Sequence, residues 1–293
     1  MKVLVSGSSG FIGTGLVSYL MQRGFNVVRL VRRTPVDGEI QWDPSCGFID
    51  SANISSIDAV IHLAAESIVA GPWTTEQKAR IRDSRVNGTR LLADTLSRMD
   101  RPPTILANAS SDVYYGDRNN ELLSESSGSG RTFLAQVAVE NESQTLGAAK
   151  AGIRVVNMRF GMVIGPTIAG MVGRFKKGLG GILGDGRQYI SWVTLYDAVR
   201  AVEHILNNDT LQGPVNVVTP NPVTNLEFTK ALGGILERPT FFRRPSILVK
   251  LLMGEMAEVE LSSVRMQSNR LAGSGFKFNY PELDGALRSV LGK

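Results

Sequence analysis

Residues 3–13 decide the fold: Val3-Leu4-Val5-Ser6-Gly7-Ser8-Ser9-Gly10-Phe11-Ile12-Gly13. This stretch joins a short apolar run, typical of a buried strand, to the beginning of a helix. Its three glycines are spaced three apart, where a phosphate can reach backbone N–H groups at a helix N-terminus. Gly7 can make the tight turn, Gly10 leaves room for a pyrophosphate, and Gly13 lets the helix pack closely on the strand. The stretch therefore predicts a dinucleotide-binding turn; the alternative is a set of glycines that serve a plain turn.

Short apolar runs alternate with helix-length segments through the first half of the chain. The runs are apolar on both faces, which is typical of parallel strands buried between two layers of helices. We expect strands at 3–5, 27–31, 59–63, 104–107 and 155–158, and helices at 12–23, 76–97 and 132–151. Gly24 and Gly152 follow two of these helices, at the position where glycine commonly ends a helix. The pattern predicts an α/β fold with a Rossmann-type, doubly wound parallel sheet.

The sequence pattern changes after Pro166. A glycine-rich stretch is followed by a helix near 194–207, a strand near 214–218 and two further helical segments. We expect residues 1–166 to form the dinucleotide-binding domain, with its sheet completed by elements from about 194–220. Residues 167–293 are expected to form a smaller C-terminal α/β lobe that contributes to substrate binding.

Composition excludes several classes of protein. The 293 residues are 43% hydrophobic and 20% charged, which excludes a disordered chain, and 32 cations against 27 anions give a net charge of +5. No run of five or six Lys and Arg occurs, so we expect neither a nucleic acid nor a membrane as partner. A single cysteine, Cys46, allows no intramolecular disulfide, and His62 and His204 lie far apart, so we expect no metal site. Met1 directly precedes the first predicted strand, and we expect a cytoplasmic protein.

The end of the second predicted strand indicates which dinucleotide is bound. In NAD-binding folds a carboxylate about twenty residues after the turn holds the ribose 2′-OH. Here Arg32 and Arg33 stand at that point, and no acid precedes Asp37. Because arginine forks bind a dianionic 2′-phosphate, these residues predict NADP, against the alternative of a solvated strand end.

Four motifs follow one another along the chain: Ser6-Gly7-Ser8-Ser9-Gly10-Phe11-Ile12-Gly13, Ile61-His62-Leu63-Ala64-Ala65, Ser110-Ser111-Asp112-Val113-Tyr114-Tyr115-Gly116 and Arg159-Phe160-Gly161-Met162-Val163-Ile164-Gly165-Pro166. In sequence and in order they resemble the motifs of the extended, sugar-nucleotide epimerase-like branch of the short-chain dehydrogenase/reductase superfamily. Residues 184–193, 213–217, 220–225 and 252–257 are similar to those of an atypical subgroup known as epimerase family proteins, which ends in a small domain of unknown function. The resemblance implies an NADP-binding protein with a small-molecule substrate, free or nucleotide-linked.

The resemblance also implies roles for individual residues. Cofactor contacts are expected, together with Arg32 and Arg33, from Gly7, Ser9, Gly10, Phe11, Ile12, Gly13, Leu63, Ala64, Ala65 and Asn87. The catalytic candidates are Ser111, Tyr114 and Tyr115, and the substrate-binding candidates are Glu66, Arg159 and Arg187. The alternatives are tyrosines that pack the loop, a solvated Glu66, an Asn87 that packs its helix, and scattered surface arginines.

The Tyr-x-x-x-Lys pair that supplies acid/base catalysis in this superfamily is missing. The lysine ammonium lowers the pKa of the tyrosine, so that the pair can exchange protons near neutral pH. No tyrosine in this chain has a lysine four residues later, and the segment 132–142 contains neither residue. We therefore expect an NADP-binding oxidoreductase or epimerase-like protein; the alternative is a non-catalytic dinucleotide-binding regulator of a protein partner.

Overall fold

The computed structural model describes residues 1–54 and 56–293, which form two compact units. The first unit comprises Met1–Ser111, Gln136–Arg159 and Val199–Val215. The second comprises Asp112–Ala135, Phe160–Ala198 and Asn216–Lys293. The units alternate along the chain, and the expected division into 1–166 and 167–293 stays a prediction.

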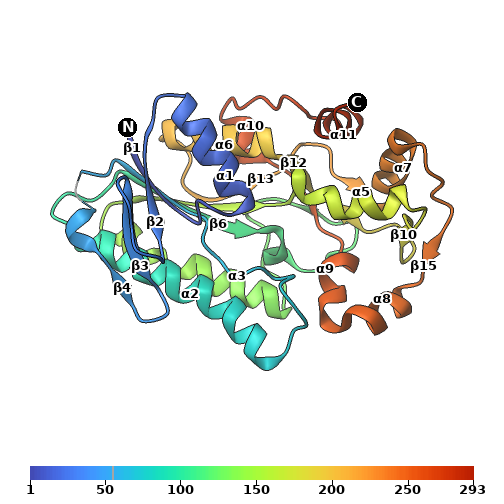
Figure 1. The fold of residues 1–293 in the computed structure, drawn as a ribbon, viewed down its shortest axis with the longest axis horizontal. Helices are drawn as coiled ribbons and strands as arrows, with labels where there is room; N and C mark the ends of the chain where they lie inside the picture. The colour runs from blue at the N-terminus through green and yellow to red at the C-terminus, as the bar shows by residue number, and fades with distance from the viewer. Residues whose placement is uncertain (55) are drawn as a thin grey trace. The chain divides into compact units, whose positions relative to one another are not determined.

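The first unit is built on an eight-stranded sheet with the order β13-β8-β6-β5-β1-β2-β3-β4 (Figure 1). These strands are β1 (Lys2–Ser6), β2 (Asn26–Val31), β3 (Glu39–Asp43), β4 (Phe48–Ile49), β5 (Ala59–His62), β6 (Ile105–Ser111), β8 (Arg154–Phe160) and β13 (Gly213–Val217). Strands β3, β2, β1, β5 and β6 run parallel to one another, and β4 pairs with β3 in the antiparallel direction. The order confirms the predicted Rossmann-type, doubly wound sheet.

Helices cover both faces of this sheet (Figure 1). They are α1 (Phe11–Gln22), α2 (Thr75–Ser97), α3 (Phe133–Ser143), α4 (Leu146–Lys150), α6 (Leu195–Asn207) and the 3-10 turn η1 (Ser51–Asn53). On one face, the Tyr19 hydroxyl of α1 donates to Glu203 Oε2 of α6 at 2.5 Å. On the other face, α2 and α4 contribute Leu92 and Ala148 to the buried cluster that includes Leu4 of β1. The runs that are apolar on both faces thus supply the core.

The single helix predicted for 132–151 is wrong, because the chain forms α3 and α4 with a break at Gln144 and Thr145. Ser143 Oγ donates to Glu140 O at 2.6 Å, and Thr145 Oγ1 donates to Glu142 O at 2.7 Å. Such side-chain bonds to carbonyls of the preceding turn compete with the helical backbone bonds. Hydroxyl residues therefore end α3 early.

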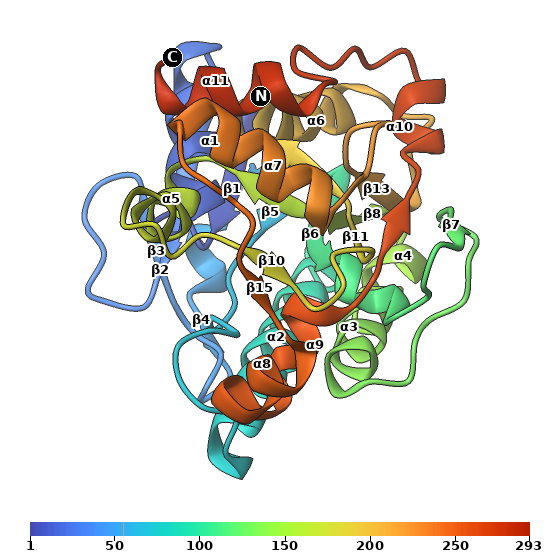
Figure 2. The same ribbon diagram turned by 90° about the vertical axis from the view of Figure 1, so that its right-hand side faces the viewer.

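The second unit contains four two-stranded ladders surrounded by short helices (Figure 2). The ladders pair β7 (Leu122–Leu123) with β16 (Arg265–Met266), β9 (Met162–Ile164) with β12 (Trp192–Thr194), β10 (Ile182–Leu183) with β15 (Arg243–Arg244), and β11 (Tyr189–Ile190) with β14 (Val223–Thr224). The helices are α5 (Ala169–Lys176), α7 (Asn225–Leu236), α8 (Ser246–Met253), α9 (Ala257–Leu261), α10 (Asn269–Gly273) and α11 (Leu283–Leu291), with 3-10 turns η2 (Asp112–Tyr115), η3 (Pro166–Ile168) and η4 (Gly254–Met256).

The core of the second unit lies around Trp192, which packs with Phe228 of α7 and Leu287 of α11. Helix α7 begins with a capping box, in which Thr224 Oγ1 accepts from the backbone of Glu227 and Glu227 Oε2 accepts from the backbone of Thr224. Across residues 1–54 and 56–293, no helix is long and apolar enough to cross a lipid bilayer.

Candidate functional site

The turn between β1 and α1 has no room for side chains at two of its three glycines. Gly7 has a φ of +68°, and a Cβ there would lie 2.7 Å from Ala64 N. A Cβ on Gly13 would lie 2.1 Å from Gly7 O. Gly10 differs, because its φ is −74° and a Cβ would meet only Gly7 O, at 3.2 Å. The fold requires glycine at 7 and 13, whereas a Cβ on Gly10 meets a single backbone atom, at the position where dinucleotide folds let the pyrophosphate approach.

The turn lies at the point where the strand order reverses. β1 has β2 on one side and β5 on the other, and all three run parallel. Open α/β sheets bind ligands beyond the carboxyl ends of their strands at such a switch point. Leu63 and Ala64 follow β5 there, and their backbone N–H groups donate to Ser6 Oγ at 3.2 and 3.4 Å. Two of the sequence motifs therefore meet at one edge of the sheet.

His62 ties β5 to β1 beneath this turn. Its Nδ1 is hydrogen-bonded to Ser6 Oγ at 2.5 Å, and its ring packs edge-on to that of Trp42, with 5.8 Å between centroids. Burial lowers the pKa of His62 to about 4, so the imidazole is neutral near pH 7. Within the described residues, His62 Nε2 is buried without a hydrogen-bond partner. These contacts favour a core histidine that joins β5 to β1 beneath the turn.

The two arginines after β2 have different surroundings. Arg33 Nη2 pairs with Glu39 Oε1 at 2.6 Å, and its Nη1 donates to Thr34 O at 2.9 Å. Arg32 is exposed. Hydrogen bonds from Ser45 lower the pKa of Asp43, and the charge of Arg32 adds weakly to that effect. Arg33 is therefore bound to its own loop, and Arg32 is the stronger candidate to contact a 2′-phosphate.

The segment after β5 is attached to α2. Glu66 N donates to Ser84 Oγ at 3.0 Å, and Arg85 Nη1 donates to Glu66 O at 2.9 Å. Burial lowers the pKa of Arg85 to about 10, which leaves it charged near pH 7. Asn87, half-buried on α2, accepts a hydrogen bond from Arg90 Nη2 at 2.7 Å, a contact within the helix that favours the packing alternative. The roles of Glu66 and Asn87 toward ligands stay predictions.

An ion pair joins α3 to the end of β8. Arg159 Nε and Nη2 donate to Glu142 Oε1 and Oε2, both at 2.8 Å, and the arginine is buried. Ser110 Oγ, near the end of β6, donates to Glu142 Oε1 at 2.6 Å. The sequence analysis did not single out Glu142, because the partners are brought together only by the fold. The charge of Arg159 is already balanced, which favours a structural role; its contact with a substrate stays a prediction.

Ser111 ends β6 in the first unit, whereas both candidate tyrosines belong to the second. The Tyr115 side chain is fully buried, and its hydroxyl donates to Asn216 Oδ1 at 2.7 Å. Tyr114 is half-buried, and its ring packs edge-on to that of Tyr115 with 5.3 Å between centroids. These contacts favour a packing role for Tyr115 and leave Tyr114 as the better candidate for proton transfer.

Arg187, the remaining substrate-binding candidate, is exposed in the second unit. Its backbone N–H donates to Asp185 Oδ1 at 2.9 Å. Within residues 1–54 and 56–293, no three His, Cys, Asp or Glu side chains are grouped to hold a metal ion. Helix α3 contains neither tyrosine nor lysine.

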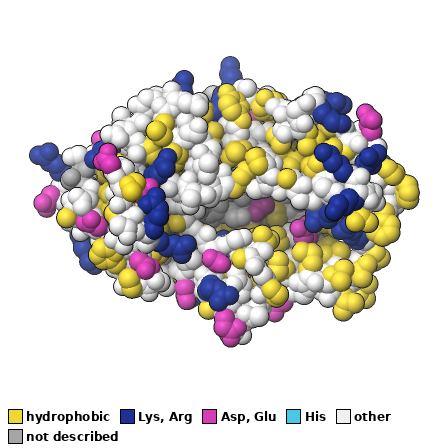
Figure 3. All heavy atoms as spheres, viewed as in Figure 1, with side chains coloured by type: hydrophobic (Ala, Val, Ile, Leu, Met, Phe, Trp, Pro, Cys, Tyr) yellow, Lys and Arg dark blue, Asp and Glu magenta, His cyan; other side chains and the backbone are white. Residues whose placement is uncertain are grey.

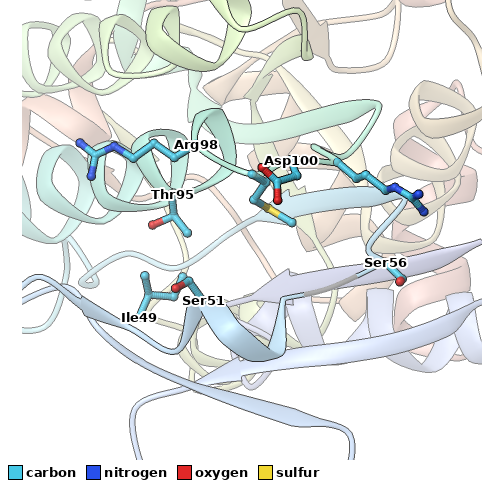
Figure 4. Close-up of a pocket in the computed structure, with 8 residues that line it drawn as sticks. Ile49, Ser51, Ser56, Thr95, Arg98 and Asp100 are labelled. Atoms are coloured by element: carbon cyan, nitrogen blue, oxygen red, sulfur yellow. The ribbon is translucent and has the colours of Figure 1, made fainter.

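A cavity of about 620 Å³ lies at the opposite edge of the sheet (Figure 4). In Figure 4, Ile49 and Ser51 lie across from Thr95 and Asp100, near the end of α2. The complete lining is Ile49, Ser51, Ser56, Thr95, Arg98, Met99, Asp100 and Arg101. The cavity adjoins the amino ends of β5 and β6, whereas parallel sheets bind ligands at their carboxyl ends, so the turn is the better candidate site.

Two family models match the chain. Residues 3–218 match the NAD dependent epimerase/dehydratase family, and residues 244–290 match a domain of unknown function, DUF1731. The Epimerase family protein MT2273 of Mycobacterium tuberculosis is 38% identical over 97% of this chain and 96% of its own.

Two solved structures are similar over the whole of this chain. The crystal structure of human epimerase family protein SDR39U1 with NADPH has a TM-score of 0.92 and 29% identity, covering 100% of both chains. The nucleoside-diphosphate sugar epimerase of Corynebacterium glutamicum has a TM-score of 0.83 and 30% identity over 58% of its own chain. These findings confirm the resemblance inferred from the four motifs. Since the family match covers more than half of the sequence, the chain belongs to the NAD dependent epimerase/dehydratase family.

Proposed function

We propose that this chain binds NADP(H) at the β1–α1 turn and uses it in oxidation–reduction or epimerisation of a small molecule. The observation that carries this proposal is the glycine turn, in which the fold demands glycine at 7 and 13, and a Cβ on Gly10 would meet only Gly7 O. The similarity to human SDR39U1, which was crystallised with NADPH, supports the choice of cofactor. Bound NADP(H) would supply a hydride acceptor or donor beside the substrate.

NADP is preferred to NAD in this proposal because of the charges after β2. Arg32 is exposed directly beyond the strand end, where the adenosine ribose lies in dinucleotide folds. A guanidinium there can make charge-assisted hydrogen bonds to a 2′-phosphate. Glu39, which is close by on β3, already accepts from Arg33 and from Val36 N, and both contacts lower the pKa of this carboxyl. The Glu39 carboxylate is therefore bound by the segment that joins β2 to β3.

A small carbonyl or alcohol compound, free or nucleotide-linked, is the substrate class we propose. The C. glutamicum relative is named as a nucleoside-diphosphate sugar epimerase, which supports the nucleotide-linked class. Glu66 and Arg187 are the candidates to contact it, because neither side chain is buried. We keep the cytoplasm as the expected location.

Proton transfer is assigned to Ser111 and Tyr114. A tyrosine without a nearby lysine lacks the cation that would favour its phenolate, so it is a poor base at neutral pH, although it can still donate a proton. Since acid/base assistance contributes roughly 10²–10⁴-fold, we expect turnover to be slow by about that factor compared with relatives that keep the Tyr-x-x-x-Lys pair.

The experiment combines titration of NADPH and NADH by intrinsic fluorescence with a panel of aldehydes, ketones and nucleotide sugars. We expect tighter binding of NADPH and slow oxidation with at least one carbonyl. Ser111→Ala and Tyr114→Phe should lower kcat with little change in NADPH affinity. The control Tyr19→Phe removes the hydroxyl through which α1 donates a hydrogen bond to Glu203 of α6, and it should leave kcat and NADPH affinity unchanged. Equal affinity for NADH, or no binding of either, would contradict the proposal.

A second candidate function is a dinucleotide-binding regulator without turnover. The absence of tyrosine and lysine from α3 favours it. NADPH binding without oxidation by any compound of the panel would decide for the regulator. Substrate turnover that requires Ser111 would decide for the enzyme.

A further inference from the structure

The second unit exposes a cluster of large apolar side chains on α8 and on the segment that precedes it. Phe241 is 85% exposed, and Ile247, Leu251 and Leu252 are 79%, 82% and 76% exposed. We define the apolar patch as the exposed residues Leu179, Phe241, Phe242, Ile247, Leu248, Leu251 and Leu252. Soluble proteins seldom expose contiguous apolar groups of this size unless they bind something.

Helix α8 has one face that is packed and one that is not. Val249 is buried, whereas the exposed residues Ile247 and Leu248 are followed one turn later by Leu251 and Leu252. Residues four apart lie on the same side of a helix, so these four side chains form one continuous apolar strip. The fold does not need this strip for its own core.

Basic side chains come from the same part of the unit as the apolar patch. Residues 174–179 contain three cations and no acid, and residues 237–261, which include α9 packed against α8, contain four cations and four acids, so the two segments carry a net charge of +3. The cations are Arg174, Lys176, Lys177, Arg238, Arg243, Arg244 and Lys250. Figure 3 shows hydrophobic side chains gathered where Figure 1 places α8, with Lys and Arg beside them.

Backbone contacts hold these segments together. β10 pairs with β15, and Ile182 N donates to Phe242 O at 3.0 Å. The Arg244 guanidinium donates to Leu179 O, and Arg238 Nε donates to Lys176 O at 3.2 Å. These bonds bring the backbone of Lys176 beside Arg238 and that of Leu179 beside Arg244, which precedes α8 by two residues, although the partners are more than sixty residues apart in the sequence.

We propose that the apolar patch docks onto an anionic lipid surface, with its leucines and phenylalanines in the interfacial layer and its cations against lipid phosphates. Amphipathic helices with this composition bind membranes through buried apolar area and attraction to acidic lipids. The charge argues against a second copy of this chain, because a two-fold interface would place the same cations against themselves. The inner leaflet that a cytoplasmic protein meets carries the required negative charge.

The expectation of no membrane partner relied on the absence of a basic run in the sequence. The cations of the patch come from separate segments, so only the folded unit brings them together. This proposal concerns attachment and is independent of the proposed dinucleotide chemistry.

Co-sedimentation with vesicles tests the proposal on the full chain. We expect binding to vesicles of phosphatidylcholine with phosphatidylglycerol, weaker binding to phosphatidylcholine alone, and release by added salt. Leu251→Ser with Leu252→Ser should weaken partitioning on the order of a hundredfold, because two leucine side chains leave the lipid. Lys176→Gln with Lys177→Gln should weaken it by roughly thirtyfold, at about 1 kcal/mol for each cation.

Helix α4 provides a matched control, because it carries Leu146, 58% exposed, and an exposed Lys150. Leu146→Ser with Lys150→Gln should leave vesicle binding unchanged, and thermal unfolding of every variant checks that the fold is intact. Absence of vesicle binding would overturn the proposal, as would equal binding to both vesicle types. A stable dimer that Leu251→Ser with Leu252→Ser converts to a monomer, without vesicle binding by the original chain, would assign the patch to self-association instead.

Discussion

Replacing Gly10 with valine should remove dinucleotide binding while the fold survives. The backbone of Gly10 has φ −74° and ψ 176°, a conformation that any residue with a side chain adopts. A Cβ at this position meets only Gly7 O, at 3.2 Å, which a shift of a few tenths of an ångström relieves. We therefore expect a stability change of about 1 kcal/mol or less.

The binding loss should be much larger than the stability loss. The valine methyl groups would occupy the space proposed for the pyrophosphate and keep it from the turn's backbone N–H groups. Hydrogen bonds to charged groups contribute about 1.5–3 kcal/mol each, so the loss of two raises the Kd for NADPH by roughly 10²–10⁴-fold.

Gly13→Ala should show the opposite pattern. A Cβ on Gly13 would lie 2.1 Å from Gly7 O and 2.9 Å from Ser8 Cα, so the helix and the turn must move apart by about 1 Å. Overpacking of this kind costs about 1–3 kcal/mol, which should lower the Tm by several degrees. The control Gly173→Ala, on α5, has nothing within 4 Å of the added Cβ and should lower neither the stability nor the NADPH affinity.

Calorimetric titration with NADPH and urea denaturation measure the two effects separately. The reasoning fails if a folded Gly10→Val variant binds NADPH like the original chain, since the cofactor would then lie elsewhere. It also fails if Gly10→Val loses as much stability as Gly13→Ala, because the space beside Gly10 would then be required by the fold.

Three further predictions concern charge. Arg32→Ala should reduce the preference for NADPH over NADH by about 1–3 kcal/mol in calorimetry. Arg33→Ala should reduce it less, because the guanidinium of Arg33 is bound to Glu39, and equal effects of the two variants would contradict this assignment. The pKa of His62 is about 4 in the folded chain and 6.5 in the unfolded chain, so its contribution to the free energy of unfolding is present above pH 6.5 and is lost as the pH falls toward 4. In urea unfolding, His62→Asn should remove this pH dependence, which amounts to up to about 3 kcal/mol. Arg159→Met should lower the free energy of unfolding by about 3–5 kcal/mol, because it leaves the Glu142 carboxylate without its cation. Adding Glu142→Gln should restore much of that stability, and a double variant no more stable than Arg159→Met would refute the ion-pair account.

The sheet was predictable from the sequence because its central strands are buried on both faces. The four residues of β5, Ala59–His62, are all buried, and the first three are apolar without a break. β3 was not predicted, since Glu39–Asp43 is short, begins and ends with an acid, and alternates between buried and half-buried positions. Trp42 is buried within it, and only its pairing with neighbouring strands makes that position part of the core.

The site was predictable where it depends on neighbours in the sequence and unpredictable where it depends on distant ones. Gly7, Gly10 and Gly13 lie within one turn, so their spacing states the geometry directly. The pairing of Glu142 with Arg159 joins residues 17 apart on two elements, and nothing in their spacing indicates contact. A sequence motif therefore predicts where a charged residue lies in the fold more securely than it predicts which residue pairs with it.

Binding and chemistry depend on different kinds of feature in this chain. The β1–α1 turn, the proposed cofactor site, depends on the backbone: Gly7 has positive φ, Gly13 has no space for a Cβ, and the contacts of both glycines lie within the first unit. Acid/base catalysis in the superfamily depends instead on two side chains of one helix, and α3 carries neither of them. A chain can therefore keep the cofactor turn complete while its proton transfer is rebuilt or absent. It follows that NADPH affinity alone cannot distinguish the enzyme from the regulator, whereas the dependence of turnover on Ser111 can.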